Sequence, residues 1–334
     1  MKESFQSLLS QAERVSYGKD RNHFLEQAIA LAEQHSEYGD SYQARLLLCE
    51  SACFSGQNRL FFDHFFWCLS FFEQYHEEFD ASDLLIRFKW ALELITTTPF
   101  LSKEEIDTLF STYHSLLLKH EFSLRSYYGL LFFHSLRAGE ITKTEHFFLQ
   151  WQNEVRDSLS DCLACETNLK LTYYLAHHKF DQAFLLADEL VATKLVCETV
   201  PNTTYAKLLI PFFEKGQTEK ATNWHHKGLF FIYGVPLYLE EQANHLMYLT
   251  RTDLNEAKLF FDDHVQLSHE SDNLYAKFHF YLASLVLAVE AKKQGVVMEM
   301  DTDFFIDSVC NIGHAFDKRN QNDYYRQYVL SFLE

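Results

Sequence analysis

The chain has few of the residues that interrupt regular secondary structure: only 10 glycines and 4 prolines occur among its 334 residues. An all-β protein needs many tight turns, and glycine and proline supply most of them. Long stretches are filled instead with leucine, glutamate, alanine, lysine and glutamine, which favour helices. The sequence therefore predicts an all-α protein with about 65% helix or more and no sheet.

Basic residues are also in short supply. The 29 lysines and arginines face 47 acidic residues, which gives a formal net charge of −18. A field of this sign repels nucleic-acid backbones and anionic lipid surfaces, so we expect neither nucleic acid nor a membrane as a direct partner. The charge helps to keep a chain with 32 phenylalanines and 18 tyrosines soluble. It also favours a basic peptide or protein partner, held less tightly as salt is added.

Signals for secretion or membrane insertion are missing. The first residues contain no apolar core of a signal peptide, and an odd number of cysteines, seven, is typical of reduced thiols. The most apolar window, residues 60–72, is too short to span a bilayer and is interrupted by Asp63 and His64. These features predict a cytoplasmic protein.

The motifs that mark common active sites are missing as well. There is no HExxH, GxSxG, phosphate-binding loop or GxGxxG, although His76 and His120 each precede a glutamate. A sequence without a nucleophile motif, a phosphate loop or a metal-ligand set is not expected to be an enzyme or to carry a cofactor.

One pair of cysteines raises the question of a metal. Cys162 and Cys165 form a CxxC, and His177 and His178 follow one helix length later. Zinc needs four ligands that converge on one point, whereas a continuous helix places these histidines about 18 Å further along its axis. We therefore interpret the two cysteines as ordinary helix thiols and expect no metal.

What the sequence does contain is a regular spacing of turns. Four turns, each followed by a small residue where a second helix begins, start at Ala138, His177, Gly216 and Thr252, so that they are 39, 39 and 36 residues apart. A period of this length is typical of stacked helix pairs, in which each pair contacts only its neighbours.

The same helical periodicity predicts helix pairs along the whole chain. The expected pairs are 3–15 with 22–34, 41–54 with 57–75, 82–95 with 103–119, 123–136 with 143–157, 161–176 with 180–193, 202–214 with 218–231, 237–249 with 254–267, and 273–293 with 302–332, the last helix broken near Gly313 or Asn320. No linker rich in serine or glycine divides them, so we expect one continuous domain over residues 1–334.

The clearest unit carries a recognisable pattern of residue types. Tyr174, Phe180, Ala183 and Ala187 occur as aromatic, aromatic, small and small positions around one turn, and Ala257 and its neighbours repeat part of this pattern. The pattern resembles the tetratricopeptide-repeat (TPR) family over about residues 120–270. The resemblance implies an α-solenoid of about eight antiparallel helix pairs that forms a curved superhelix.

The resemblance also implies a binding surface, because the first helix of each pair lines the concave groove in this family. The family's inward positions, with close neighbours, correspond here to Arg125, Ser126, Tyr128, Asn168, Lys170, Thr172, Thr203 and Gln242. An amide side chain can pair with both the N–H and the C=O of an extended peptide. We therefore expect Asn168 and Gln242 to face a partner and to lie outside the seam between helices.

Two functions agree with these features. The first is a non-enzymatic scaffold that binds a protein or peptide segment in its groove, where a rigid surface lowers the entropic cost of binding. The second is a peptide-responsive sensor or regulatory module of a signalling or toxin-inhibition system, whose effector is another chain or a segment outside this sequence. The sequence leaves both open.

Overall fold

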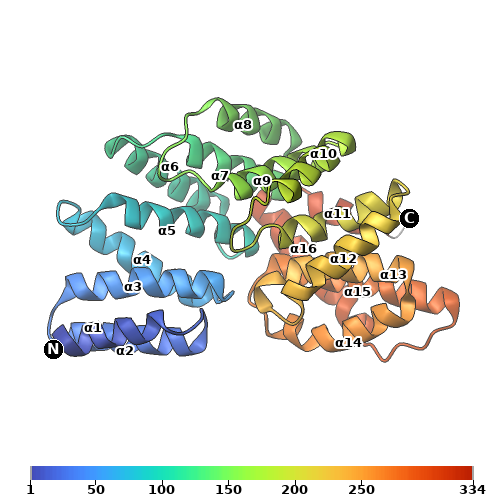
Figure 1. Ribbon diagram of the computed structural model, residues 1–334, viewed down its shortest axis with the longest axis horizontal. Helices are drawn as coiled ribbons and strands as arrows, with labels where there is room; N and C mark the ends of the chain where they lie inside the picture. Colours follow the sequence, from blue (N-terminus) through green and yellow to red (C-terminus); the bar gives the residue numbers. More distant parts are fainter. Residues whose placement is uncertain (1, 333–334) are drawn as a thin grey trace. The chain divides into compact units, whose positions relative to one another are not determined.

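The computed structural model describes residues 2–332, and every regular element in that range is a helix (Figure 1). The helix content of 78% confirms the all-α prediction. The α-helices are α1 Lys2–Glu13, α2 Lys19–Gln34, α3 Tyr38–Phe54, α4 Asn58–Tyr75, α5 Ala81–Leu94, α6 Lys103–Lys119, α7 Arg125–Arg137, α8 Ile141–Asn153, α9 Leu163–Ala176, α10 Phe180–Ala192, α11 Asn202–Glu214, α12 Thr218–Ile232, α13 Leu239–Thr252, α14 Leu254–Glu270, α15 Leu274–Gln294, α16 Thr302–Asn320 and α17 Tyr324–Leu330. Two short 3-10 helices, η1 Ile95–Thr97 and η2 Pro236–Tyr238, complete the set.

The predicted helices match the observed ones to within a few residues at their ends. The expected break in the last helix falls after Asn320, where Gln321 adopts a left-handed conformation with φ 58° and separates α16 from α17. Turn residues explain several other ends: Gly56, Gly139 and Gly216 all have φ near +70°, a region that glycine enters without steric cost.

The helices group into two compact units. Unit 1 comprises Met1–Ile95, Glu104–Leu130 and Trp151–Leu159, and unit 2 comprises Thr96–Lys103, Leu131–Gln150 and Ser160–Glu334. These ranges alternate along the sequence, and one boundary falls inside α7. A single continuous domain over the whole chain stays a prediction.

Unit 1 is organised around a column of aromatic rings. The rings of Phe61 and Phe65 stack within α4 at 5.7 Å between centroids, Phe65 meets Phe88 of α5 at 5.2 Å, and Phe88 meets Tyr113 of α6 at 5.2 Å. All four side chains are fully buried. Aromatic side chains bury large apolar areas, so this column explains why Phe61 and Phe65 of α4 are apolar.

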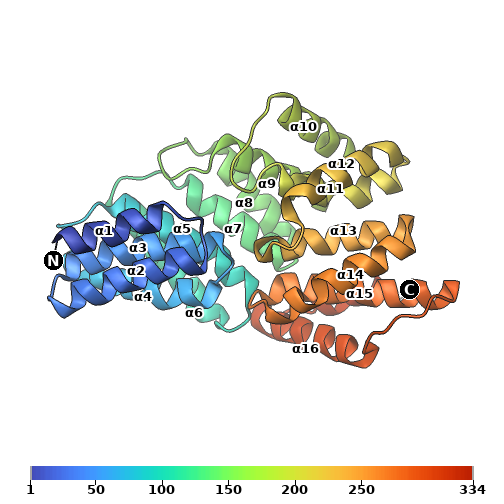
Figure 2. The ribbon, with the colours of Figure 1, turned by 60° about the horizontal axis from the view of Figure 1, so that its bottom comes forward.

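Unit 2 is built from helices that pack on their neighbours in sequence and on the helix two positions further along. Helix α9 packs on α10, α11 on α12 and α13 on α14, while α11, α13 and α15 follow one another across the unit (Figure 2). The seams between them are apolar. Their fully buried residues include Leu171, Leu208, Leu246, Phe278 and Phe280.

One described helix, α15, is long and apolar enough to cross a membrane by length and composition alone. It is longer than the apolar window at residues 60–72. Half of its most apolar stretch is buried, and Phe278, Phe280 and Leu287 belong to the core of unit 2. A buried core helix can have the same length and apolar composition, so α15 is weak evidence for a membrane span.

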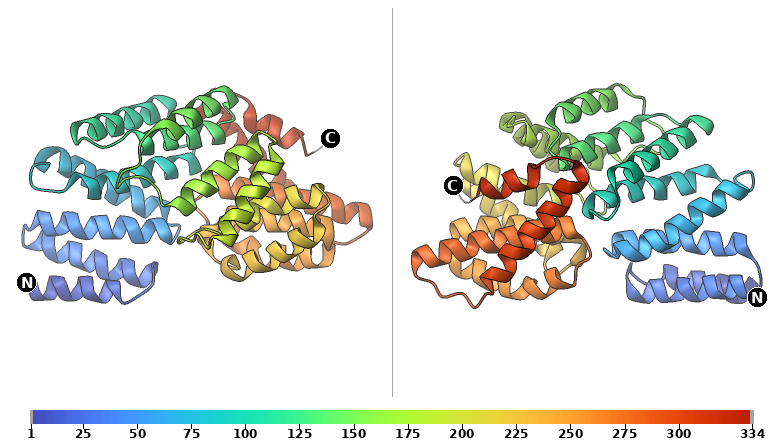
Figure 3. Two further views of the ribbon diagram at one scale, coloured as in Figure 1. Left: turned by 45° about the horizontal axis from the view of Figure 1, so that its top comes forward. Right: turned by 180° about the vertical axis from the view of Figure 1, so that it is seen from behind.

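Segments far apart in the sequence meet within unit 2, where the C-terminal helices lie beside the end of α7 (Figure 3). Arg319 donates to the carbonyl of Thr98 at 2.8 Å, Asn322 donates to that of Ala138 at 2.7 Å, and the Tyr325 hydroxyl donates to that of Arg137 at 2.9 Å. A Cβ atom at Gly139 would lie 2.2 Å from the Tyr324 ring, so only glycine fits at this turn. We name this set of contacts the C-terminal closure.

Truncation of the aromatic column should be costly. We predict that Phe88→Ala lowers the free energy of unfolding by about 3–5 kcal/mol, because it removes a fully buried ring and leaves a cavity. Urea denaturation followed by circular dichroism measures this loss. The control is Leu118→Ala on α6, whose side chain is 56% exposed. An equal effect of both substitutions would show that the column is not a centre of packing.

The C-terminal closure makes a second prediction. Tyr325→Phe removes one hydrogen bond to α7 and should make local opening of α16 and α17 easier by about 0.5–1.5 kcal/mol, or roughly two- to tenfold in the opening equilibrium. Amide hydrogen exchange by mass spectrometry reports this as faster exchange confined to these helices. The control is Tyr328→Phe on the same helix, whose hydroxyl makes no hydrogen bond in the described structure. Identical exchange in the two variants would contradict a closing role for Tyr325.

Candidate binding site

Three of the predicted binding residues belong to unit 1, and two of these are occupied by internal contacts. The guanidinium of Arg125 lies over the Trp151 ring and donates to the carbonyls of Trp151 and Glu154 at 2.8 and 2.7 Å. The Ser126 hydroxyl bonds to that of Tyr113 at 2.9 Å. Both side chains are buried and fix the start of α7, so they offer little to a partner. Tyr128 is half-buried against Tyr127.

The other five predicted residues belong to unit 2, and four of them lie on α9 and α11. The Asn168 side chain donates to the Thr203 hydroxyl at 3.1 Å and accepts from the Thr204 hydroxyl at 2.8 Å. Thr172 donates to the carbonyl of Asn168 at 2.9 Å and accepts from Lys207 at 3.2 Å. Asn168 therefore uses its amide to join α9 to α11, so the expectation that it lies outside the seam between helices is wrong. Lys170 of α9 is half-buried, with its amine 5.9 Å from the centroid of the Tyr174 ring.

The expectation that Gln242 lies outside the helix seam is wrong. Its side chain is fully buried and donates to the carbonyls of Ile232 and Val235 at 2.7 and 3.1 Å, so it holds the turn between α12 and α13. The physical reason is helix register. Neighbouring residues on a helix point about 100° apart, so a small error in register turns a position that was assigned to the groove into the seam.

A row of charged and aromatic side chains crosses the first helices of unit 2. We name it the inner polar row. Its members are Arg137 of α7, Lys207 of α11, Glu240 and Glu241 of α13, and Tyr275 and His279 of α15.

Arg137 is the best-anchored member of the inner polar row. Its guanidinium forms an ion pair with Glu240 at 2.7 Å, donates to the Thr96 hydroxyl at 2.9 Å and lies 3.9 Å from the centroid of the Tyr275 ring. Such a set of contacts offsets the cost of taking the charge out of water.

Lys207 and Glu241 are different, because neither forms an ion pair among the described residues although Glu241 is buried and Lys207 is half-buried. Burial lowers the pKa of Lys207, an effect that Glu240 and Glu241 partly offset. Burial also raises the pKa of Glu241 to about 7, helped by repulsion from Glu240 and opposed by Lys207 and Arg137. Lys207 and Glu241 are therefore the members of the inner polar row whose charges no ion pair neutralises.

His279 of α15 behaves as a neutral member of the row. Burial lowers its pKa to about 4, so the ring carries no charge at neutral pH. It can donate or accept a hydrogen bond without adding to the field of Arg137.

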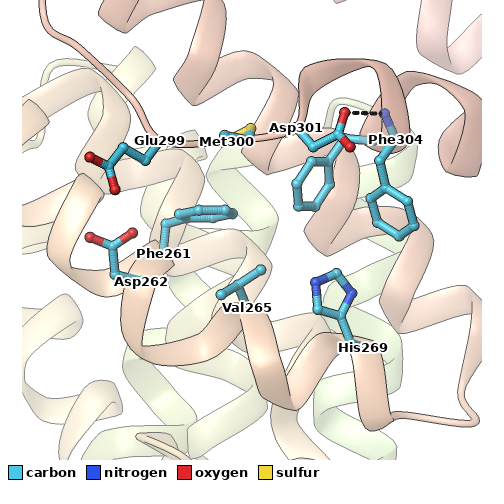
Figure 4. A pocket seen from close by; sticks show the side chains of 9 residues that line it. Phe261, Asp262, Val265, His269, Glu299, Met300, Asp301 and Phe304 are labelled. Atoms are coloured by element: carbon cyan, nitrogen blue, oxygen red, sulfur yellow. Dashed lines mark hydrogen bonds between the residues drawn. The ribbon is translucent and has the colours of Figure 1, made fainter.

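A separate pocket of about 350 Å³ lies between α14, the segment after α15 and α16 (Figure 4). Asp262 and Glu299 lie at one end, whereas His269 and Phe304 lie at the other, and Phe261 forms part of the wall. Asp301 is engaged as the cap of α16, accepting from the N–H of Phe304 at 3.0 Å. The pocket belongs to the second helices of their pairs, so it is distinct from the predicted groove.

The structure also changes the interpretation of the CxxC. It places Cys197, from the segment after α10, beside Cys162 and Cys165, so that the three sulfur atoms lie within 4.8 Å of one another. Only two thiols and two distant histidines are apparent as ligands from the sequence, and the structure adds a third thiol. Sequence spacing gave no indication of it, because Cys197 comes from a segment without helical periodicity.

Comparison with known proteins finds no match: no family model, no curated protein and no solved structure is significantly similar to this chain.

The raised pKa of Glu241 predicts a pH-dependent cost to stability. The folded-state value of about 7 exceeds the ordinary value of 4.5, so the folded protein retains a proton that the unfolded chain releases between these two values. Stability is lost as the pH rises through this window. We predict that Glu241→Gln removes that cost and stabilises the protein at pH 8.5 by about 1–3 kcal/mol, with a much smaller effect at pH 5.5.

Urea denaturation at the two pH values measures this difference. The matched control is Glu219→Gln on α12, an exposed position at which the two pH values should give the same small effect. A Glu241→Gln variant that is destabilised equally at both pH values would show that its carboxyl is needed for packing rather than strained by charge.

Proposed function

We propose that the protein is a non-enzymatic binding module in which TPR-like helix pairs present the inner polar row to an extended protein or peptide segment. The observation that carries this proposal is a buried carboxyl, Glu241, and a half-buried amine, Lys207, on successive first helices, neither of which forms an ion pair among the described residues. The repeated packing of α11 on α13 and of α13 on α15 supports the TPR-like interpretation.

The energetics favour a ligand at this row. A charge held away from water without a close partner is costly, and strongly perturbed ionisable groups occur preferentially at functional sites. An extended segment supplies both N–H and C=O groups, and a lysine or arginine side chain on it would satisfy Glu241. The net charge of −18 adds a long-range preference for such a basic segment.

Polar residues on α9 and α11 extend the proposed surface. Thr172 of α9 already binds the amine of Lys207, and Lys170 of the same helix has its amine over an aromatic ring. We assign Thr172 and Lys207 to direct contact with the partner. Asn168, Thr203 and Gln242 serve instead to hold the helices that present these groups.

A second candidate function, a peptide-responsive sensor, is favoured by one specific observation. Arg137 belongs to the inner polar row through its side chain and to the C-terminal closure through its carbonyl, which accepts from Tyr325. A ligand that pairs with Glu240 would compete with Arg137 and so weaken the support of α17. A sensor requires a ligand that binds with different affinity to the states with and without the C-terminal closure.

Peptide selection tests the binding proposal. A display library of unstructured peptides is selected on the immobilised protein, and the best peptide is measured by titration calorimetry. We predict that the double variant Lys207→Met with Glu241→Gln binds this peptide about ten- to a hundredfold more weakly, since two charge-assisted contacts are lost. Added salt should weaken binding to the wild type more than to the variant.

The matched control is Lys227→Met with Glu219→Gln on α12, which also removes one charge of each sign but at exposed positions. Binding should be unchanged in this control. Equal affinities of the wild type and the Lys207 and Glu241 double variant would contradict the proposal and place the site elsewhere, with the pocket of α14 and α16 next to be tested.

A further inference from the structure

The three thiols described above form a compact group at the N-terminus of α9. Cys162 is the N-cap residue, and its sulfur accepts a hydrogen bond from the N–H of Cys165 at 3.4 Å. Cys165 follows in the first turn of the same helix. Its sulfur lies 3.1 Å from that of Cys197, and all three sulfur atoms lie within 4.8 Å of one another.

The segment that carries Cys197 is held in place by contacts that do not involve sulfur. The N–H of Leu195 donates to the carbonyl of Leu190 at 3.1 Å, and the N–H of Cys197 donates to the carbonyl of Val200 at 3.0 Å. Ala164, Leu190 and Val200 form a small buried cluster beneath it. The third thiol is therefore positioned by the fold in advance, rather than by a flexible loop.

Polar groups around the sulfur atoms suit negatively charged ligands. The N–H groups of Thr199 and Val200 donate toward the sulfur of Cys197, and the hydroxyl of Thr199 lies 3.9 Å from it. The other two sulfur atoms lie at the positive end of a helix. Hydrogen bonds of this kind orient thiolate ligands and balance their charge in metal sites.

We propose that Cys162, Cys165 and Cys197 bind a zinc ion through three thiolates, with a solvent molecule or a partner's side chain as the fourth ligand. Zinc–sulfur bonds of about 2.3 Å in a tetrahedron place sulfur atoms about 3.8 Å apart. The present separations of 3.1 Å for one pair and up to 4.8 Å for the group bracket that value, so small side-chain rotations complete the site. The thiol protons leave as the metal binds.

Exposure of Cys162 supplies an entry path for the ion, since its side chain is open to solvent whereas Cys165 and Cys197 are half-buried. Three soft sulfur ligands favour thiophilic ions over magnesium or calcium, which prefer oxygen. No histidine or carboxylate joins the sulfur group within the described residues, so the fourth position is open to exchange. The proposal is independent of the inner polar row and does not rest on the proposed function.

Cadmium titration of the full chain tests the site, because cadmium replaces zinc and its bonds to thiolates absorb in the ultraviolet in proportion to their number. Reduced, metal-free protein should show an absorption that saturates at one cadmium ion per chain and that zinc displaces. Zinc should also raise the melting temperature.

Three variants sharpen the test. Cys162→Ser keeps a good helix cap, so it should fold normally while its absorption falls to about two thirds of the wild-type value and its affinity drops at least tenfold. Cys197→Ser should lose the stabilisation by zinc. The matched control is Cys310→Ser, an exposed thiol on α16, which should bind cadmium like the wild type.

The proposal is overturned if reduced wild-type protein shows no saturable absorption, or if the absorption survives Cys197→Ser and Cys162→Ser unchanged. It is also overturned if protein alkylated at the moment of cell lysis carries a Cys165–Cys197 disulfide, detected by a mass lower by two hydrogens, and binds no cadmium after reduction. Those results would assign the group to thiol redox chemistry.

Discussion

In unit 2 the guanidinium of Arg137 joins more distant parts of the sequence than any other group described here. It pairs with Glu240 of α13, lies against Tyr275 of α15 and donates to Thr96, while the carbonyl of the same residue accepts from Tyr325 of α17. Removal of one partner from a shielded ion pair commonly costs 3–5 kcal/mol, because the other charge is left without compensation. Three chain segments that are not consecutive therefore depend on one side chain, and a fourth depends on the backbone of the same residue.

The same charge sets the electrostatics of the inner polar row. Glu240 and Glu241 are adjacent on α13 and repel each other, and only Glu240 has Arg137 as a close partner. The pairing leaves Glu241 as the carboxyl with the raised pKa and Lys207 as the nearest cation. The arrangement that stabilises the fold is thus also the arrangement that leaves one acid and one amine without an ion pair.

The helices of this chain were predictable from sequence, whereas its sites were only partly so. Turn residues such as Gly139 and Gly216 and the apolar periodicity mark the helix ends, since both are local properties. Which face of a helix meets solvent depends on tertiary partners. Arg125 was expected in the groove, but the carbonyls of Trp151 and Glu154 bind it.

An error of one residue in helix register changes which side chain is expected at the binding surface. Gln242 and Glu241 are neighbours on α13. Gln242 holds a turn, whereas Glu241 belongs to the inner polar row, because a helix turns about 100° per residue. The signal in the sequence for the inner polar row was the acidic pair in the first turn of α13. For Cys197 there was no such signal, since its approach to Cys165 is produced by the path of the segment after α10.

The thiol group and the inner polar row are linked through the helices that carry them. Cys165 begins α9, whose Asn168 and Thr172 bind Thr203 and Lys207 of α11. On the other side, the carbonyl of Glu198, next to Cys197, accepts from the Tyr238 hydroxyl at 3.1 Å, directly before α13 and its glutamates. A metal held by the three sulfur atoms would fix the start of α9 to the segment that reaches both α11 and α13. It would therefore influence the spacing of Lys207 and Glu241, which lie on those two helices.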